Sequence, residues 1–159
     1  MSASKRILLA EDNANDAELT LLALAEQNLA GNVTLVRDGA EALDHLLTTL
    51  SPAWEEGRPA VVLLDIKMPK LNGLEVLKRI RADERLRTIP VVMLTSSRED
   101  RDLAESYRLG ANAYVVKPVV FAEFLEVVKK VGSFWVDLNE PPPTSTRSVF
   151  DHWSDRDPV

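Results

Sequence analysis

Short apolar runs that favour strands alternate five times with longer helical patterns, and this alternation limits the fold more than any other feature. The predicted strands occupy residues 6–10, 33–37, 61–64, 90–94 and 113–116. Two predicted helices cover 16–29 and 121–131. Another begins at the capping-box spacing of 38–41 and runs to about 47, a further one opens at 72–73, and one begins at 97–100 and ends near 109. This pattern predicts an α/β fold whose parallel sheet carries helices on both faces.

Five consecutive βα units predict a doubly wound five-stranded parallel sheet in the flavodoxin-like order 2-1-3-4-5. We expect this domain over residues 5–135. Residues 136–159 are predicted to form a C-terminal tail that is partly ordered or forms an interface, since a proline run at 141–143 precedes the apolar residues Val149, Phe150 and Trp153. We expect these three side chains to dock on a second subunit and form a homodimer.

Composition excludes several classes of function. The chain has 19 Lys and Arg against 25 Asp and Glu, and its net charge of −6 argues against a nucleic-acid partner. The absence of cysteine excludes disulfides, thiolate metal sites and thiol catalysis. The apolar runs are too short to span a membrane, and no signal-peptide pattern opens the chain. We therefore expect a cytoplasmic protein with no membrane partner.

Polar side chains follow four of the predicted strands at their carboxyl ends. Glu11 and Asp12 follow the first strand, Asp65 the third, Thr95 the fourth and Lys117 the fifth. In the order 2-1-3-4-5 the first and third strands are neighbours, so the three carboxylates share one pocket. Carboxylates this close repel one another unless a cation lies among them, and their hard oxygen atoms suit Mg²⁺. The lysine and the hydroxyl can bind phosphoryl oxygens, which predicts phosphoryl chemistry on a carboxylate.

Recognisable motifs surround these positions in chain order. They are LLAEDN at 8–13, LLDIKMP at 63–69, Gly73, LTSS at 94–97 and YVVKP at 114–118. Together they resemble the receiver domain of two-component response regulators over roughly residues 5–133. The long loop before the third strand, the segments 83–90 and 106–110, and the ending Phe134-Trp135 resemble single-domain response regulators that partner with bacterial phytochrome histidine kinases.

The resemblance implies the chemistry of the acidic pocket. Asp65 would accept a phosphoryl group from a phosphohistidine of a sensor histidine kinase. Asp12, Asp65 and the backbone carbonyl of Lys67 would bind Mg²⁺, and Glu11 would act through water because it is longer than the commoner Asp at that position. The protein would be a signalling phosphoacceptor, and it would catalyse only its own phosphorylation and dephosphorylation.

The resemblance also implies a switch. Lys117 would pair with the phosphoryl oxygens, and the Lys117–Pro118 peptide bond would be cis. Thr95 would hydrogen-bond the phosphoryl group and move toward it, and Tyr114 would change rotamer in response. The face built from the fourth helix, the fifth strand and the fifth helix would then change its affinity for a partner.

Two other functional classes use similar residues. A haloacid-dehalogenase-like phosphohydrolase also needs an Asp nucleophile, Mg²⁺, a hydroxyl and a lysine, but it requires a second acid two residues after the nucleophile, where this chain has Lys67. A flavodoxin-like cofactor carrier would offer hydroxyls and amides to a phosphate in its first loop, where Glu11 and Asp12 would repel the anion. The phosphohydrolase remains the principal alternative.

Overall fold

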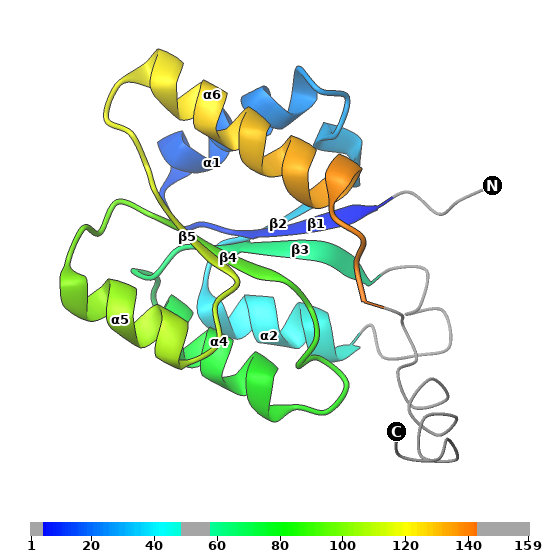
Figure 1. Ribbon diagram of the computed structural model, residues 1–159, viewed down its shortest axis with the longest axis vertical. Coiled ribbons are helices and arrows are strands. Elements are labelled where there is room, and N and C mark those ends of the chain that lie inside the picture. Colours follow the sequence, from blue (N-terminus) through cyan, green and yellow to red (C-terminus); the bar gives the residue numbers. More distant parts are fainter. Residues whose placement is uncertain (1–4, 49–57, 143–159) are drawn as a thin grey trace, which may run out of the picture.

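The computed structural model describes residues 5–48 and 58–142, which form a single parallel sheet with helices on both faces (Figure 1). The sheet has five strands in the order β2-β1-β3-β4-β5. These strands are β1 (Arg6–Ala10), β2 (Val33–Val36), β3 (Pro59–Leu64), β4 (Val91–Thr95) and β5 (Ala113–Val116). The predicted fold class and strand order are confirmed.

Two helical layers cover the sheet. One face carries α1 (Ala14–Ala25) and α6 (Phe121–Gly132), and the other carries α2 (Gly39–Thr48), α4 (Gly73–Ala82) and α5 (Asp100–Arg108) (Figure 1). Successive residues of a strand point to opposite faces, so β1 serves both cores. Ile7 and Leu9 pack beneath α1 and α6, whereas Leu8 and Ala10 pack against α2 and α4. Every residue of β3 is buried, as expected for a central strand.

Side-chain caps begin two of the helices on the second face. The side chain of Asn72 accepts the N–H of Glu75 at 3.0 Å and caps α4. At α2, Oδ1 of Asp38 accepts the N–H of Glu41 at 2.7 Å, and the Glu41 carboxylate accepts the N–H of Arg37. The capping function predicted at 38–41 is therefore confirmed.

The start of α5 lies at the end of the stretch 97–100 where the sequence predicted a helix to begin. The helix begins at Asp100, and Glu99 occupies the N-cap position without a side-chain cap bond. Ser97 instead donates its hydroxyl hydrogen to Oδ2 of Asp102 at 2.6 Å. Ser97 lies two residues before the N-cap position, and its hydroxyl contacts a carboxylate of the first turn.

The helix that follows β5 departs from expectation at both of its ends. Phe124 and Val128 are buried, whereas Phe121, on the same apolar stripe, is 54% exposed because it opens α6 at the edge of the sheet. A π-helical turn, η2 (Ser133–Leu138), continues α6, and Val136 is buried in the core beneath α1 and α6. The apolar tail residues Val149, Phe150 and Trp153 lie outside the described residues.

Close backbone contact fixes the loop that follows β3. A Cβ atom at Gly73 would lie 2.0 Å from the backbone oxygen of Asp65, and the Gly73 N–H donates to the Ile66 carbonyl at 2.8 Å. The first turn of α4 therefore lies directly against the carboxyl end of β3. This contact sets the position of the loop that carries Asp65 and Lys67.

Candidate functional site

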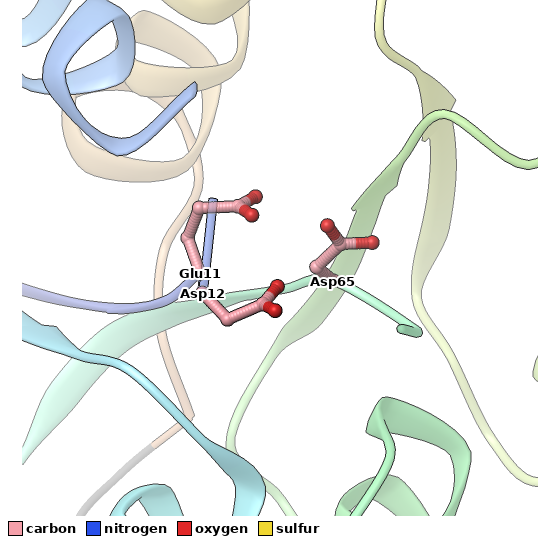
Figure 2. A group of neighbouring side chains, drawn as sticks. All are labelled: Glu11, Asp12 and Asp65. Atoms are coloured by element: carbon pink, nitrogen blue, oxygen red, sulfur yellow. The ribbon is translucent and has the colours of Figure 1, made fainter. Parts of the chain in front are cut away.

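Three carboxylates meet at the carboxyl edge of the sheet. Figure 2 shows Glu11 and Asp12 on the loop after β1 and Asp65 at the end of β3, with their carboxylates directed into a common space. One carboxylate oxygen from each residue lies within 4.8 Å of the others. The neighbouring strands enforce this, since the Asp65 N–H donates to the Ala10 carbonyl at 3.1 Å. The cluster predicted from the strand ends is present.

The ammonium group of Lys117 lies at the centre of this negative charge. Its Nζ donates to Oδ2 of Asp65 at 2.8 Å, to Oδ2 of Asp16 at 2.9 Å and to Oε2 of Glu11. The Lys117 side chain is only 3% exposed. A lysine has three N–H donors, so all three are occupied by carboxylates.

Asp16 is absent from the residues predicted from the sequence. It lies in the first turn of α1, four residues after Asp12, and the Asn13 side chain caps its N–H at 3.0 Å. The available signal was its place in the first helical turn, shortly after Asp12 in the chain. That signal does not show that Lys117 reaches this turn of α1.

Burial and charge oppose each other at this site. Burial, reinforced by the nearby Asp65 carboxylate, raises the pKa of Glu11 from 4.5 to about 7, although the hydrogen bond from Lys117 lowers it in part. Burial alone would lower the pKa of Lys117, but its bonds to Asp65 and Glu11 raise it above its ordinary value. The lysine therefore stays protonated, and the remaining negative charge of the carboxylates favours the binding of a further cation.

The predicted hydroxyl and aromatic residues lie beside the cluster on the next two strands. Thr95 ends β4, is 1% exposed, and its hydroxyl oxygen accepts the N–H of Ser97 at 3.3 Å. Tyr114 on β5 donates its hydroxyl hydrogen to the Ser97 carbonyl at 3.0 Å. Both residues therefore contact the same loop after β4.

The donor set fits a divalent cation. Three carboxylates on two adjacent loops offer hard oxygen ligands, and a single lysine does not balance their charge.

The Lys117–Pro118 peptide bond is trans, so the prediction of a cis bond is wrong. In this arrangement Lys117 Nζ lies 2.8 Å from Asp65 Oδ2.

A family model described as the response regulator receiver domain matches residues 7–129. The chain belongs to this family. The family match agrees with the resemblance seen in the sequence and with the strand order. The receiver is therefore a phosphoacceptor of two-component signalling, and its partner is a histidine kinase. The haloacid-dehalogenase alternative is not supported.

Curated relatives match most of the receiver. The protein named "Probable methanogenesis regulatory protein FilR2" of Methanothrix harundinacea (strain 6Ac) is 40% identical over 86% of this chain and 86% of its own length. Response regulator Rcp1 of Synechocystis sp. (strain ATCC 27184 / PCC 6803 / Kazusa) is 34% identical over 84% of this chain and 90% of its own length.

Solved structures extend the likeness to phytochrome signalling. The phosphorylated cyanobacterial phytochrome response regulator RcpA matches with a TM-score of 0.79 and 37% identity over 88% of this chain and 99% of its own. Bacteriophytochrome response regulator RtBRR is 53% identical, with a TM-score of 0.65 over 95% and 92% of the two chains. A structure of Rcp1 is an Mn²⁺-bound form, and it matches with a TM-score of 0.76 and 33% identity over 87% and 99% of the two chains.

Within residues 5–48 and 58–142, no helix is long and apolar enough to cross a bilayer.

Proposed function

We propose that Asp65 is the residue that accepts the phosphoryl group. The observation that carries this proposal is its position: its carboxylate belongs to the three-carboxylate cluster and also contacts Lys117 Nζ at 2.8 Å. Asp65 therefore has a cation beside it where negative charge would build up during transfer. Its Oδ1 also accepts the Ile66 N–H at 2.7 Å, which fixes the orientation of the carboxylate.

In the proposed transfer, a carboxylate oxygen of Asp65 attacks the phosphorus of a phosphohistidine. A P–O bond forms, the P–N bond breaks, and the electron pair of that bond leaves with the imidazole nitrogen of the kinase. Lys117 and the Thr95 hydroxyl bind oxygens of the arriving phosphoryl group. In a separate reaction, water attacks the phosphorus of the acyl phosphate, the bond between phosphorus and the Asp65 oxygen breaks, and inorganic phosphate leaves while the carboxylate is restored. The receiver would thus catalyse both its own phosphorylation and its own dephosphorylation.

We propose Mg²⁺ as the cation of the cluster, with Asp12, Asp65 and the Lys67 backbone carbonyl as ligands and Glu11 acting through water. When bound, the ion would neutralise charge on the carboxylate and phosphoryl oxygens. Support comes from the oxygen-only donor set of the cluster and from the Mn²⁺-bound form of the relative Rcp1. Mg²⁺ prefers one or two carboxylates together with phosphate oxygens, which matches this set.

Phosphorylation would change the surface formed by α5, β5 and α6. Thr95 and Tyr114 both contact Ser97 in the loop that leads into α5. If Thr95 moves toward a phosphoryl group, the carbonyl that Tyr114 binds changes position, and Tyr114 changes rotamer. The two residues would therefore report the state of Asp65 to this face.

The finer identity of the partners rests on likeness. RcpA, Rcp1 and RtBRR support a bacterial phytochrome histidine kinase as the phosphoryl donor. A homodimer, formed through the apolar tail beyond residue 142, remains our proposal for the assembly.

The experiment that tests the proposed acceptor is incubation with acetyl phosphate and Mg²⁺, read by intact mass. The wild-type receiver should gain one phosphoryl group, and Asp65→Asn should gain none because an amide is not a nucleophile. Asp44→Asn changes an exposed carboxylate on α2 in the same way and serves as the matched control. Phosphorylation of Asp65→Asn at the wild-type rate would contradict the proposal.

A further inference from the structure

The three carboxylates that surround Lys117 do not have the same surroundings. Glu11 and Asp65 are 2% and 8% exposed at the side chain, whereas Asp16 is 28% exposed. Within the part of the chain that the structure describes, Glu11 and Asp65 belong to the carboxylate cluster that suits a cation, and Asp16 does not. Asp16 is therefore the partner that Lys117 can release to water at the lowest cost.

Asp16 also lines the approach to the lysine. A pocket of about 260 Å³ opens between α1 and the β5–α6 loop, and its lining includes Asp16, Ser96, Lys117, Pro118 and Val119. A group in this pocket that contacts Lys117 also lies close to the Asp16 carboxylate, because Asp16 Oδ2 is 2.9 Å from Lys117 Nζ. Asp16 is the one acidic side chain among the residues that line this pocket, so it is the source of negative charge beside Lys117 there.

We propose that Asp16 is a specificity-determining residue for phosphoryl transfer. Its carboxylate occupies the Lys117 N–H that a phosphoryl oxygen needs, and it thereby disfavours small anionic donors relative to donors with a neutral leaving group. The inference rests on the proposed function of Asp65. Asp16 acts through Lys117 and through its charge, so it is a positioning residue for the reaction.

The physical basis is charge repulsion of unequal strength. Acetyl phosphate is a dianion and releases an acetate anion, whereas phosphoramidate is a monoanion near neutral pH and releases ammonia. Phosphoramidate also contains the P–N bond that a phosphohistidine contains. At equal distance, the repulsion energy from the Asp16 carboxylate is twice as large for a dianion as for a monoanion, so a penalty of about twofold for the monoanion corresponds to a penalty of about fourfold for the dianion.

The test measures initial phosphorylation rates with each donor at fixed Mg²⁺. Asp16→Asn keeps the size of the side chain and removes its charge, and Asp16→Ala removes both. Glu18→Gln makes the same charge change at an exposed position of α1 and is the matched control. Asp16→Glu keeps the charge and tests rescue.

Asp16→Asn and Asp16→Ala should raise the acetyl phosphate rate about fourfold and the phosphoramidate rate about twofold, so the ratio of the two rates rises. Glu18→Gln and Asp16→Glu should keep the wild-type ratio, and high salt should reduce the gain. A purely structural loss would slow both donors equally and leave the ratio unchanged.

An unchanged or lower ratio in Asp16→Asn, or an equal rise in Glu18→Gln, would overturn the inference while the proposed function stands. A wild-type receiver that takes a phosphoryl group from neither donor would instead overturn the proposed function, and the inference with it.

Discussion

Lys117 Nζ and Asp65 Oδ2 lie 2.8 Å apart although 52 residues separate them in the chain. Parallel strands bring them together, because β3 and β5 both deliver their carboxyl ends to one edge of the sheet and β4 lies between them. Lys117 is buried among Asp65, Glu11 and Asp16, so removing it takes away the cation that these carboxylates share.

Lys117→Ala should therefore destabilise the metal-free receiver by about 3–5 kcal/mol, the usual cost of breaking a buried ion pair from one side. Saturating Mg²⁺ should recover part of this loss, since a cation then balances the carboxylates. Urea unfolding in EDTA and in Mg²⁺ measures both effects, with the exposed Lys130→Ala on α6 as control. A Lys117→Ala loss no larger than that of Lys130→Ala would contradict the ionic role.

The raised pKa of Glu11 predicts a dependence of stability on pH. Burial raises this pKa from 4.5 to about 7, so between these values the folded chain keeps a proton that the unfolded chain has released. The folded state then binds more protons, and the free energy of unfolding should fall as pH rises from about 5 to 7 in EDTA. Glu11→Gln should flatten this slope relative to wild type, and Glu18→Gln should retain it. Equal slopes for Glu11→Gln and wild type would rule out this origin.

Gly73 predicts a strong and specific steric effect. A Cβ at this position would lie 2.0 Å from the Asp65 backbone oxygen, so Gly73→Ala must displace α4 or the β3 end. We expect a loss of about 3 kcal/mol in stability and weaker Mg²⁺ binding. Gly31→Ala is the matched control, because a Cβ there meets nothing within 4 Å. Thermal unfolding and Mg²⁺ titration of both variants check this, and similar behaviour of the two would contradict it.

Most of the fold could be predicted because each strand and helix carries a local signal. Continuous apolar runs indicated the buried strands, and the residues at the ends of those strands indicated the acidic cluster and Lys117. Local sequence signals could not show how exposed each helical residue is, because exposure depends on how the helix packs against the sheet. Phe121 fits the apolar stripe of α6, yet the edge of the sheet leaves it exposed.

Asp16 could not be predicted as a partner of Lys117 for the same reason. The sequence places Asp16 in a first helical turn, where an acidic residue is favourable at any surface helix. Only the packing of α1 beside the end of β5 brings its carboxylate to the lysine. The role of a charged residue at a helix start thus depends on contacts that are 101 residues away in the chain.

Tyr114 should report phosphorylation through its bond to the Ser97 carbonyl. Tyr114→Phe removes this bond, so hydrogen exchange at residues 97–103 should rise in the unphosphorylated receiver and change less on phosphorylation than in wild type. Tyr107→Phe on α5 is the control, because Tyr107 is 51% exposed. Identical exchange changes in Tyr114→Phe and wild type would remove Tyr114 from the switch.

The proposed homodimer predicts an effect of the tail. Truncation after Glu140 removes Val149, Phe150 and Trp153 and should shift the mass measured by light scattering toward that of a monomer. A full-length protein that is already monomeric at micromolar concentration, or a truncated protein that stays dimeric, would contradict the tail as the contact.

The most direct test of the account is to locate the phosphoryl group. Borohydride reduces an aspartyl phosphate to homoserine, which peptide mass spectrometry then assigns to one position. After incubation with acetyl phosphate and Mg²⁺, the account predicts homoserine at position 65 and its loss when Mg²⁺ is omitted. Homoserine at position 12 or 16, or a phosphorylated receiver that yields no homoserine, would contradict it.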